Sequence, residues 1–376
     1  MKLIMKIAKI VLIALIAGIA IFMIFGSKIA KQYQKKYYNK NYQPEWIDAS
    51  LINGYPSGFH IDGIPWISYE KAYCQPTALQ MIAYKQGIKE DLGYFNFLTG
   101  FTYGAFYRAD MGVLYPYTDP ISGFITAAPY LGLRMRYFVT DDEGLFLKTI
   151  KFYISRGYPV GAELDVGKLR GDTEFLPHLE LIVGYYDKKI EYYETTDKEQ
   201  VRLNVKGIMA DEQKIAEAVM NNSKSFMHPW KYAFMIFEKI EKKDDPKDIW
   251  ARNGTSMVGS RMGIMFSGSF AMHELALGFK KTGKLKYDVS TDAISYTRID
   301  NAKFLAGHFK SDKDVQDAAA FLMEEGRIYE EVLPEAKNKI TSKEEIAKIT
   351  EKLGRAALLE KQAGDIFLKK SGVKAK

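Results

Sequence analysis

The sequence predicts an α+β domain followed by an all-helical domain, with a transmembrane helix ahead of both. Two short apolar runs, residues 179–185 and 189–193, are separated by three residues, a connection that suits neighbouring antiparallel strands. Beyond residue 211 the apolar positions recur at helical spacing. Close to the N-terminus, residues 10–26 are apolar and uncharged. These patterns define the fold class and the order of its parts.

The chain of 376 residues, 47% of them hydrophobic, is long enough to bury the cores of two domains. Changes in composition predict a basic N-terminal leader at 1–9, a transmembrane signal anchor at 10–26, a stalk at 27–50, a cysteine-bearing domain at 51–210 and a helical domain at 211–376. No internal repeat interrupts this order.

The apolar run at residues 10–26 is 17 residues long, which is just enough to span a bilayer. No pair of small residues at signal-peptidase spacing follows it, so we expect an uncleaved anchor and a single-pass membrane protein. Three lysines precede the run and five follow it before residue 41. The positive-inside rule then favours a cytoplasmic catalytic domain, whereas the short basic leader favours an extracytoplasmic one, which we prefer.

The net charge of +7 does not predict a nucleic-acid partner. Lysine and arginine alternate with acidic residues along most of the chain, and the clearest basic excess flanks the apolar run. The sequence has no cluster of cysteine, histidine and acidic residues at zinc-site spacing, and the glycines between 254 and 268 lack the lysine of a phosphate loop. We therefore expect neither a metal nor a cofactor, and the oligomeric state stays open.

Cys74 is the only cysteine, and it stands at the start of a predicted helix. Pro76 suits the first helical turn, Leu79 and Ile82 follow at core spacing, and Gly87 suits the end. Unpaired backbone N–H groups and the helix dipole stabilise a thiolate at such a position. Cys74 is thus a candidate nucleophile, and the alternative is a buried small apolar residue.

A cysteine nucleophile needs a base, and His178 is the strongest of the five histidines. It begins the strand that runs to Tyr185, so a rigid element would hold it. Glu194 ends the next strand, where its carboxylate could accept the second ring N–H, and Asp197 is the reserve acid. The predicted catalytic residues are therefore Cys74, His178 and Glu194.

Three blocks carry a family resemblance: Cys-Gln-Pro-Thr-Ala-Leu-Gln-Met at 74–81, Gly-Tyr-Pro-Val at 157–160, and His-Leu-Glu-Leu-Ile-Val-Gly-Tyr at 178–185 with the strand that ends at Glu194. With them, residues 63–194 resemble the papain-like superfamily and, within it, the bacteriocin-processing, double-glycine-type peptidase family. The resemblance implies a papain-like fold, in which the nucleophile helix packs on an antiparallel sheet. It also implies a membrane-anchored, thiol-dependent hydrolase that cleaves a peptide or amide bond.

The chain departs from that family around the oxyanion hole. Gln75 stands where the family has glycine, and Ser68 stands where it has a glutamine, six residues before the nucleophile. We expect the Cys74 N–H, with Ser68 or Gln75, to bind the oxyanion. Glu194 replaces the family's aspartate.

The chain is also similar to the butirosin-biosynthesis protein H type of papain-like acyltransferase. In that group a cysteine domain with a glycine- and aromatic-rich stretch, here residues 97–107, precedes a helical domain, here 212–376. This resemblance implies transfer of an acyl group from a Cys74 thioester to an amine acceptor. The partner is then a peptide or an acyl-amide substrate. A catalytically inactive binding module on the same fold is the third alternative.

Overall fold

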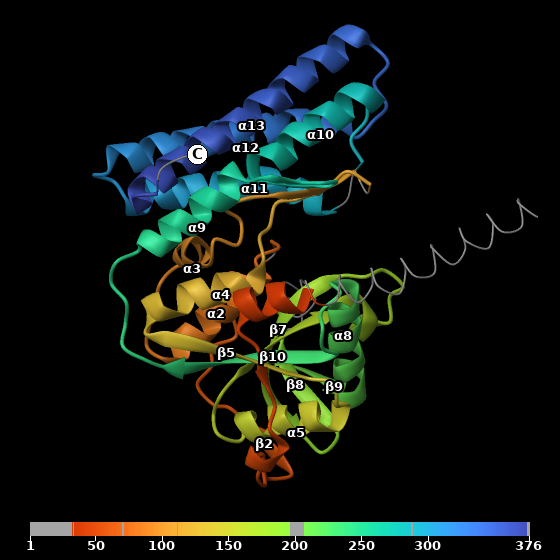
Figure 1. The fold of residues 1–376 in the computed structure, drawn as a ribbon, viewed down its shortest axis with the longest axis vertical. Coiled ribbons are helices and arrows are strands. Elements are labelled where there is room, and N and C mark those ends of the chain that lie inside the picture. Colours follow the sequence, from red (N-terminus) through yellow and green to blue (C-terminus); the bar gives the residue numbers. More distant parts are fainter. Residues whose placement is uncertain are drawn as a thin grey trace, which may run out of the picture.

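The computed structural model describes residues 32, 34–69, 71–110, 112–195, 207–286 and 289–373. It has a sheet-containing part, which lies at the bottom of Figure 1, and a helical part, which lies at the top. The structure is therefore mixed in α and β, and its C-terminal region is helical, in agreement with the broad fold class that the sequence predicts.

An eight-stranded sheet forms the lower part, in the order β1-β5-β10-β6-β7-β8-β9, with β2 paired to β7. Its strands are β1 (Glu45–Trp46), β2 (Gly58–His60), β5 (Leu133–Thr140), β6 (Val160–Asp165), β7 (Pro177–Tyr186), β8 (Lys189–Tyr193), β9 (Ile208–Asp211) and β10 (Tyr232–Lys239). All pairs are antiparallel except β1 with β5. Strands β7 and β8 form the hairpin that the two short apolar runs predict.

Helices cover this sheet. They are α2 (Cys74–Lys85), α3 (Leu92–Thr99), α4 (Pro120–Ala127), α5 (Glu143–Ile154), α6 (Val166–Arg170) and α8 (Glu212–Ser225), with short 3-10 turns at Ala49–Leu51 and Ala128–Leu131 and a helical stretch at 34–42. Figure 1 shows α2, α3 and α4 on the side of the sheet toward the helical part and α5 on the other side. Helix α2 begins at Cys74, as its sequence predicts, and buries Leu79, Met81 and Ile82.

The upper part contains α9 (Lys247–Val258), α10 (Gly268–Thr282), α11 (Val289–His308), α12 (Lys313–Ala336) and α13 (Lys343–Ser371). A second, four-stranded sheet joins distant parts of the chain in the order β11-β12-β3-β4. Its strands are β3 (Phe106–Arg108), β4 (Val113–Tyr115), β11 (Arg261–Met262) and β12 (Met265–Ser267). The end of the glycine- and aromatic-rich stretch therefore pairs with a hairpin of the helical part.

The structure differs from the predicted division at residue 211, because residues 211–376 include a strand of the main sheet. Strand β10 pairs with β5 along its whole length and contacts β6 at Met235, opposite Gly161. It reads Tyr-Ala-Phe-Met-Ile-Phe-Glu-Lys and is buried from Tyr232 to Phe237. A strand covered on both faces lacks the alternation that separates it from a buried helix. The helical part thus begins at α9.

The predicted leader at 1–9 and anchor at 10–26 lie outside the described residues. Within the part of the chain that the structure describes, no helix combines the length and the apolar character needed to cross a membrane.

Arg298 on α11 connects the helices of the upper part. Its fully buried guanidinium bonds to Glu360 on α13, at 3.0 Å from Nη2 to Oε1, and lies 3.3 Å from Glu325 on α12. It also donates to the carbonyl oxygens of Thr102 and Gly104, at 2.7 Å each. Burial, and then the charge of Glu360, hold the pKa of Glu325 well above its usual range. One arginine thus fixes three helices and the aromatic-rich loop.

Replacing Arg298 by leucine should destabilise the protein by about 3–5 kcal/mol, because Glu360 would be left buried without its cation. Urea unfolding of the wild-type and variant proteins measures this loss of stability. The matched control is Arg355→Leu, which removes an exposed pair with Glu324 and should cost at most about 1 kcal/mol. Equal losses in the two variants would contradict this account of how the helical part is held.

Candidate active site

Cys74 is the first residue of α2 and is half-buried. The segment before it is held by α11 of the helical part. The Tyr73 hydroxyl donates to Asp300 at 2.9 Å, and the Ala72 backbone N–H donates to the Tyr296 hydroxyl at 3.2 Å. The helical part therefore fixes the position of the candidate nucleophile.

His178 and Glu194 lie together across the β7–β8 hairpin. The register pairs Leu181 with Tyr193, so Glu194 follows β8 beside the start of β7. His178 Nε2 lies 2.8 Å from Glu194 Oε1, and Arg170 Nη2 donates to Glu194 Oε2 at 3.1 Å. Both oxygens of Glu194 are therefore hydrogen-bonded. The residue is only 1% exposed, so these bonds are shielded from solvent. The carboxylate fixes the orientation of the imidazole ring.

The pKa of His178 is raised well above its usual value of 6.5. Burial by itself would lower the pKa, but the negative charge of Glu194 beside the ring raises it. The Cys74 side chain adds to this effect through a hydrogen bond to His178. The structure thus brings Cys74, His178 and Glu194 together, and the raised pKa of His178 favours the protonated imidazole.

Glu180 is a second carboxyl group at this site, and the catalytic assignment from sequence does not include it. It is fully buried on β7, and its Oε1 lies 3.6 Å from His178 Nε2. Within the described chain no donor reaches either of its oxygens. Burial, and then the charge of Glu194, hold its pKa well above the usual range, so it is a neutral acid that can donate to Glu194. The sequence feature that could have identified Glu180 is that it is the single charged residue in the apolar strand 179–185.

Donor atoms of His178, Glu180 and Glu194 all lie within 4.8 Å of one another, a spacing that could hold a metal ion. His178 Nε2 is, however, already bonded to Glu194, and Arg170 neutralises that same carboxylate. The contacts among these side chains account for the cluster without a cation.

The two candidate oxyanion residues have different surroundings. Gln75 is fully buried, and its side-chain amide donates to the Pro120 carbonyl oxygen at the start of α4. The Ser68 hydroxyl is buried and finds no partner among the described residues. The next residue, Tyr69, bonds to the Thr195 carbonyl oxygen at 3.0 Å, beside Glu194. Ser68 is therefore better placed to donate than Gln75, and the reserve acid Asp197 lies outside the described residues.

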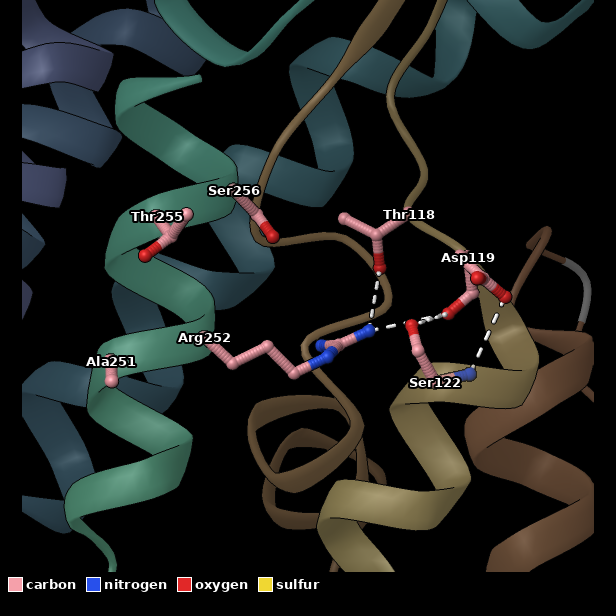
Figure 2. A pocket seen from close by; sticks show the side chains of 7 residues that line it. All are labelled: Thr118, Asp119, Ser122, Ala251, Arg252, Thr255 and Ser256. Atoms are coloured by element: carbon pink, nitrogen blue, oxygen red, sulfur yellow. Dashed lines mark hydrogen bonds between the residues drawn. The ribbon is translucent and has the colours of Figure 1, made fainter. Parts of the chain in front are cut away.

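A cavity of about 340 Å³ lies between α4 and α9 (Figure 2). Its lining consists of Thr118, Asp119, Ser122, Ala251, Arg252, Thr255 and Ser256. Arg252 donates to the Thr118 hydroxyl at 3.1 Å and to the Asp119 carbonyl oxygen at 3.2 Å. Burial lowers its pKa to about 10. Neither Cys74 nor His178 lines this cavity, so it is distinct from the cysteine and histidine cluster.

Comparisons with known proteins give little. No protein-family model matches the chain, and no curated protein matches it. Among solved structures, a crystal structure described as that of a C39-like peptidase from Bacillus anthracis is similar over 50% of this chain and 100% of its own, at 12% identity and a TM-score of 0.34. A likeness at this TM-score is too slight to define a fold or an activity.

Replacing Glu180 by glutamine should reduce the loss of stability between pH 6 and pH 9. A raised folded-state pKa gives stability that is complete below the unfolded value and is lost as pH rises through the folded value. Glutamine keeps the shape of the neutral acid and cannot ionise. Thermal unfolding at both pH values measures the difference, with the exposed Glu330→Gln as control. An unchanged pH dependence in Glu180→Gln would show that this carboxyl is not a buried neutral acid.

Proposed function

We propose that the protein is a membrane-anchored, thiol-dependent hydrolase of the cysteine-peptidase type, which cleaves a peptide or amide bond. The observation that supports this best is that His178 is hydrogen-bonded both to Glu194 and to the Cys74 side chain. A nucleophile, a base and a group that orients the base are the three components that such catalysis needs.

In this mechanism the Cys74 thiolate attacks the substrate carbonyl carbon, and the imidazolium of His178 gives its proton to the leaving amine. Because Nε2 is bonded to Glu194, this proton is carried on Nδ1. A thioester remains on Cys74. His178 then takes a proton from water, the hydroxide attacks the thioester, and the acid leaves as the thiolate re-forms. The proton that leaves with the amine is thus replaced by one from water, and the thiolate and imidazolium are restored at the end of the cycle.

The oxyanion formed in both steps would be bound by backbone and side-chain donors. The Cys74 N–H lies in the first turn of α2, where helix N–H groups lack intrahelical acceptors. Ser68 supplies the second donor in our proposal, because its hydroxyl has no other partner among the described residues. Gln75 would first have to give up its bond to Pro120.

Acyl transfer to an amine is the second candidate, since it shares the thioester intermediate. The contacts of α11 with Tyr73 and Ala72 favour it, because they bring a helical part to the nucleophile, as in the acyltransferase resemblance. Hydrolysis requires no further acceptor site, so it is our first proposal. An inactive binding module would gain nothing from burying an ion pair, which costs free energy.

Alkylation of Cys74 by iodoacetamide at pH 6 tests the proposal, because the chain has no other cysteine. The wild-type protein should react at least about ten times faster than His178→Gln, since the imidazolium stabilises the reactive thiolate. The matched control is His228→Gln, which changes a half-buried histidine whose pKa burial lowers to about 4 and which should leave the rate unchanged. A wild-type rate no higher than that of His178→Gln would refute the proposed pair.

A further inference from the structure

Five large apolar side chains are exposed at one place on the sheet-containing part. We call this set the apolar face: Tyr37 55% exposed, Phe175 37%, Leu176 40%, Phe226 46% and Met227 66%. The rings of Phe175 and Phe226 lie 5.8 Å apart. Tyr38 donates to the Phe226 carbonyl oxygen at 2.9 Å and contacts Tyr37 at 5.3 Å between ring centroids. The apolar face thus joins the helical stretch 34–42 to the residues after α8.

Exposed basic side chains lie on the same segments as the apolar face. Lys35, Lys36 and Lys40 are exposed on the stretch 34–42, which carries no acidic residue, and Lys224 is exposed beside Phe226. Asp172 and Glu174 on the neighbouring loop oppose them in part. Lysines near an anionic lipid surface are attracted to it, and tyrosine is favoured at the level of the headgroups. This combination of charge and apolar area suits a bilayer surface better than an acidic or a purely apolar partner.

The sequence also limits the distance between the apolar face and the predicted transmembrane run. Seven residues of the sequence separate the apolar run at 10–26 from the stretch 34–42. Seven extended residues span at most about 25 Å. With the run embedded in a bilayer, as predicted, Tyr38 and the bonded Phe226 are held close to the membrane surface.

We propose that the apolar face lies against the surface of an anionic phospholipid bilayer. Phe175 and Leu176 precede His178 by three and two residues, so the docked face borders the candidate active site. The bond that is cut would then be one presented at the membrane surface. This last consequence rests on the proposed hydrolase function, whereas the docking does not.

The test uses the full chain with Cys74→Ser, which removes the only cysteine and the nucleophile together. Met227→Cys in this background is labelled with a fluorophore, and the protein is reconstituted into vesicles of phosphatidylcholine and phosphatidylglycerol. The matched control is Met262→Cys, since Met262 is 61% exposed on β11 of the other part. Spin-labelled lipids should quench the label at 227 at least about threefold more than the label at 262, and aqueous iodide should show the opposite order.

Phe226→Cys provides a second site on the same face if Met227→Cys fails to fold. Equal lipid quenching at 227 and 262 overturns the proposal. Protection of 227 from iodide without lipid quenching also overturns it, because a second copy or another protein would then cover the face. Alkylation of Cys74 is measured separately in the wild-type chain, so a failed docking is distinguishable from a failed hydrolase assignment.

Discussion

The buried pair of His178 and Glu194 is the interaction on which the account of this protein depends. Removing two ionisable groups from water is costly unless their charges and hydrogen bonds are satisfied. Here Arg170 bonds to the second oxygen of Glu194, the Thr195 hydroxyl contacts the imidazole at 3.1 Å, and Glu180 is held neutral by burial. These neighbours favour the protonated imidazole and fix its ring, which is the arrangement that the proposed role of Cys74 requires.

The helical part contacts the same site at the residues that precede Cys74. Its helix α11 bonds to Tyr73 and Ala72, directly before Cys74, and carries Arg298, which holds the loop at Thr102 and Gly104. The second sheet pairs β3 with β12 and so joins the two halves of the sequence. The helical part is thus bonded to the residues directly before Cys74, and changes within it can reach Cys74 through these contacts.

The sequence was most informative where local chemistry determines local structure. A proline in the first turn predicted the helix at Cys74, and two apolar runs around a three-residue turn predicted the hairpin that carries His178 and Glu194. Strand β10 was missed because it is buried on both faces and has no alternating pattern. The environment of Glu180 and the bond of Gln75 to Pro120 depend on tertiary packing, which spacing along a chain cannot reveal.

The protonation state of the His178 ring tests the central claim most directly. Nitrogen-15 chemical shifts of the imidazole, assigned by comparison with His178→Gln, report whether both ring nitrogens carry protons. Because the pKa of His178 is raised, both nitrogens should remain protonated at pH 7.5, and the Glu194→Gln variant should lose this proton at a lower pH. A neutral imidazole at pH 7.5 in the wild-type protein, titrating near 6.5, would contradict the account.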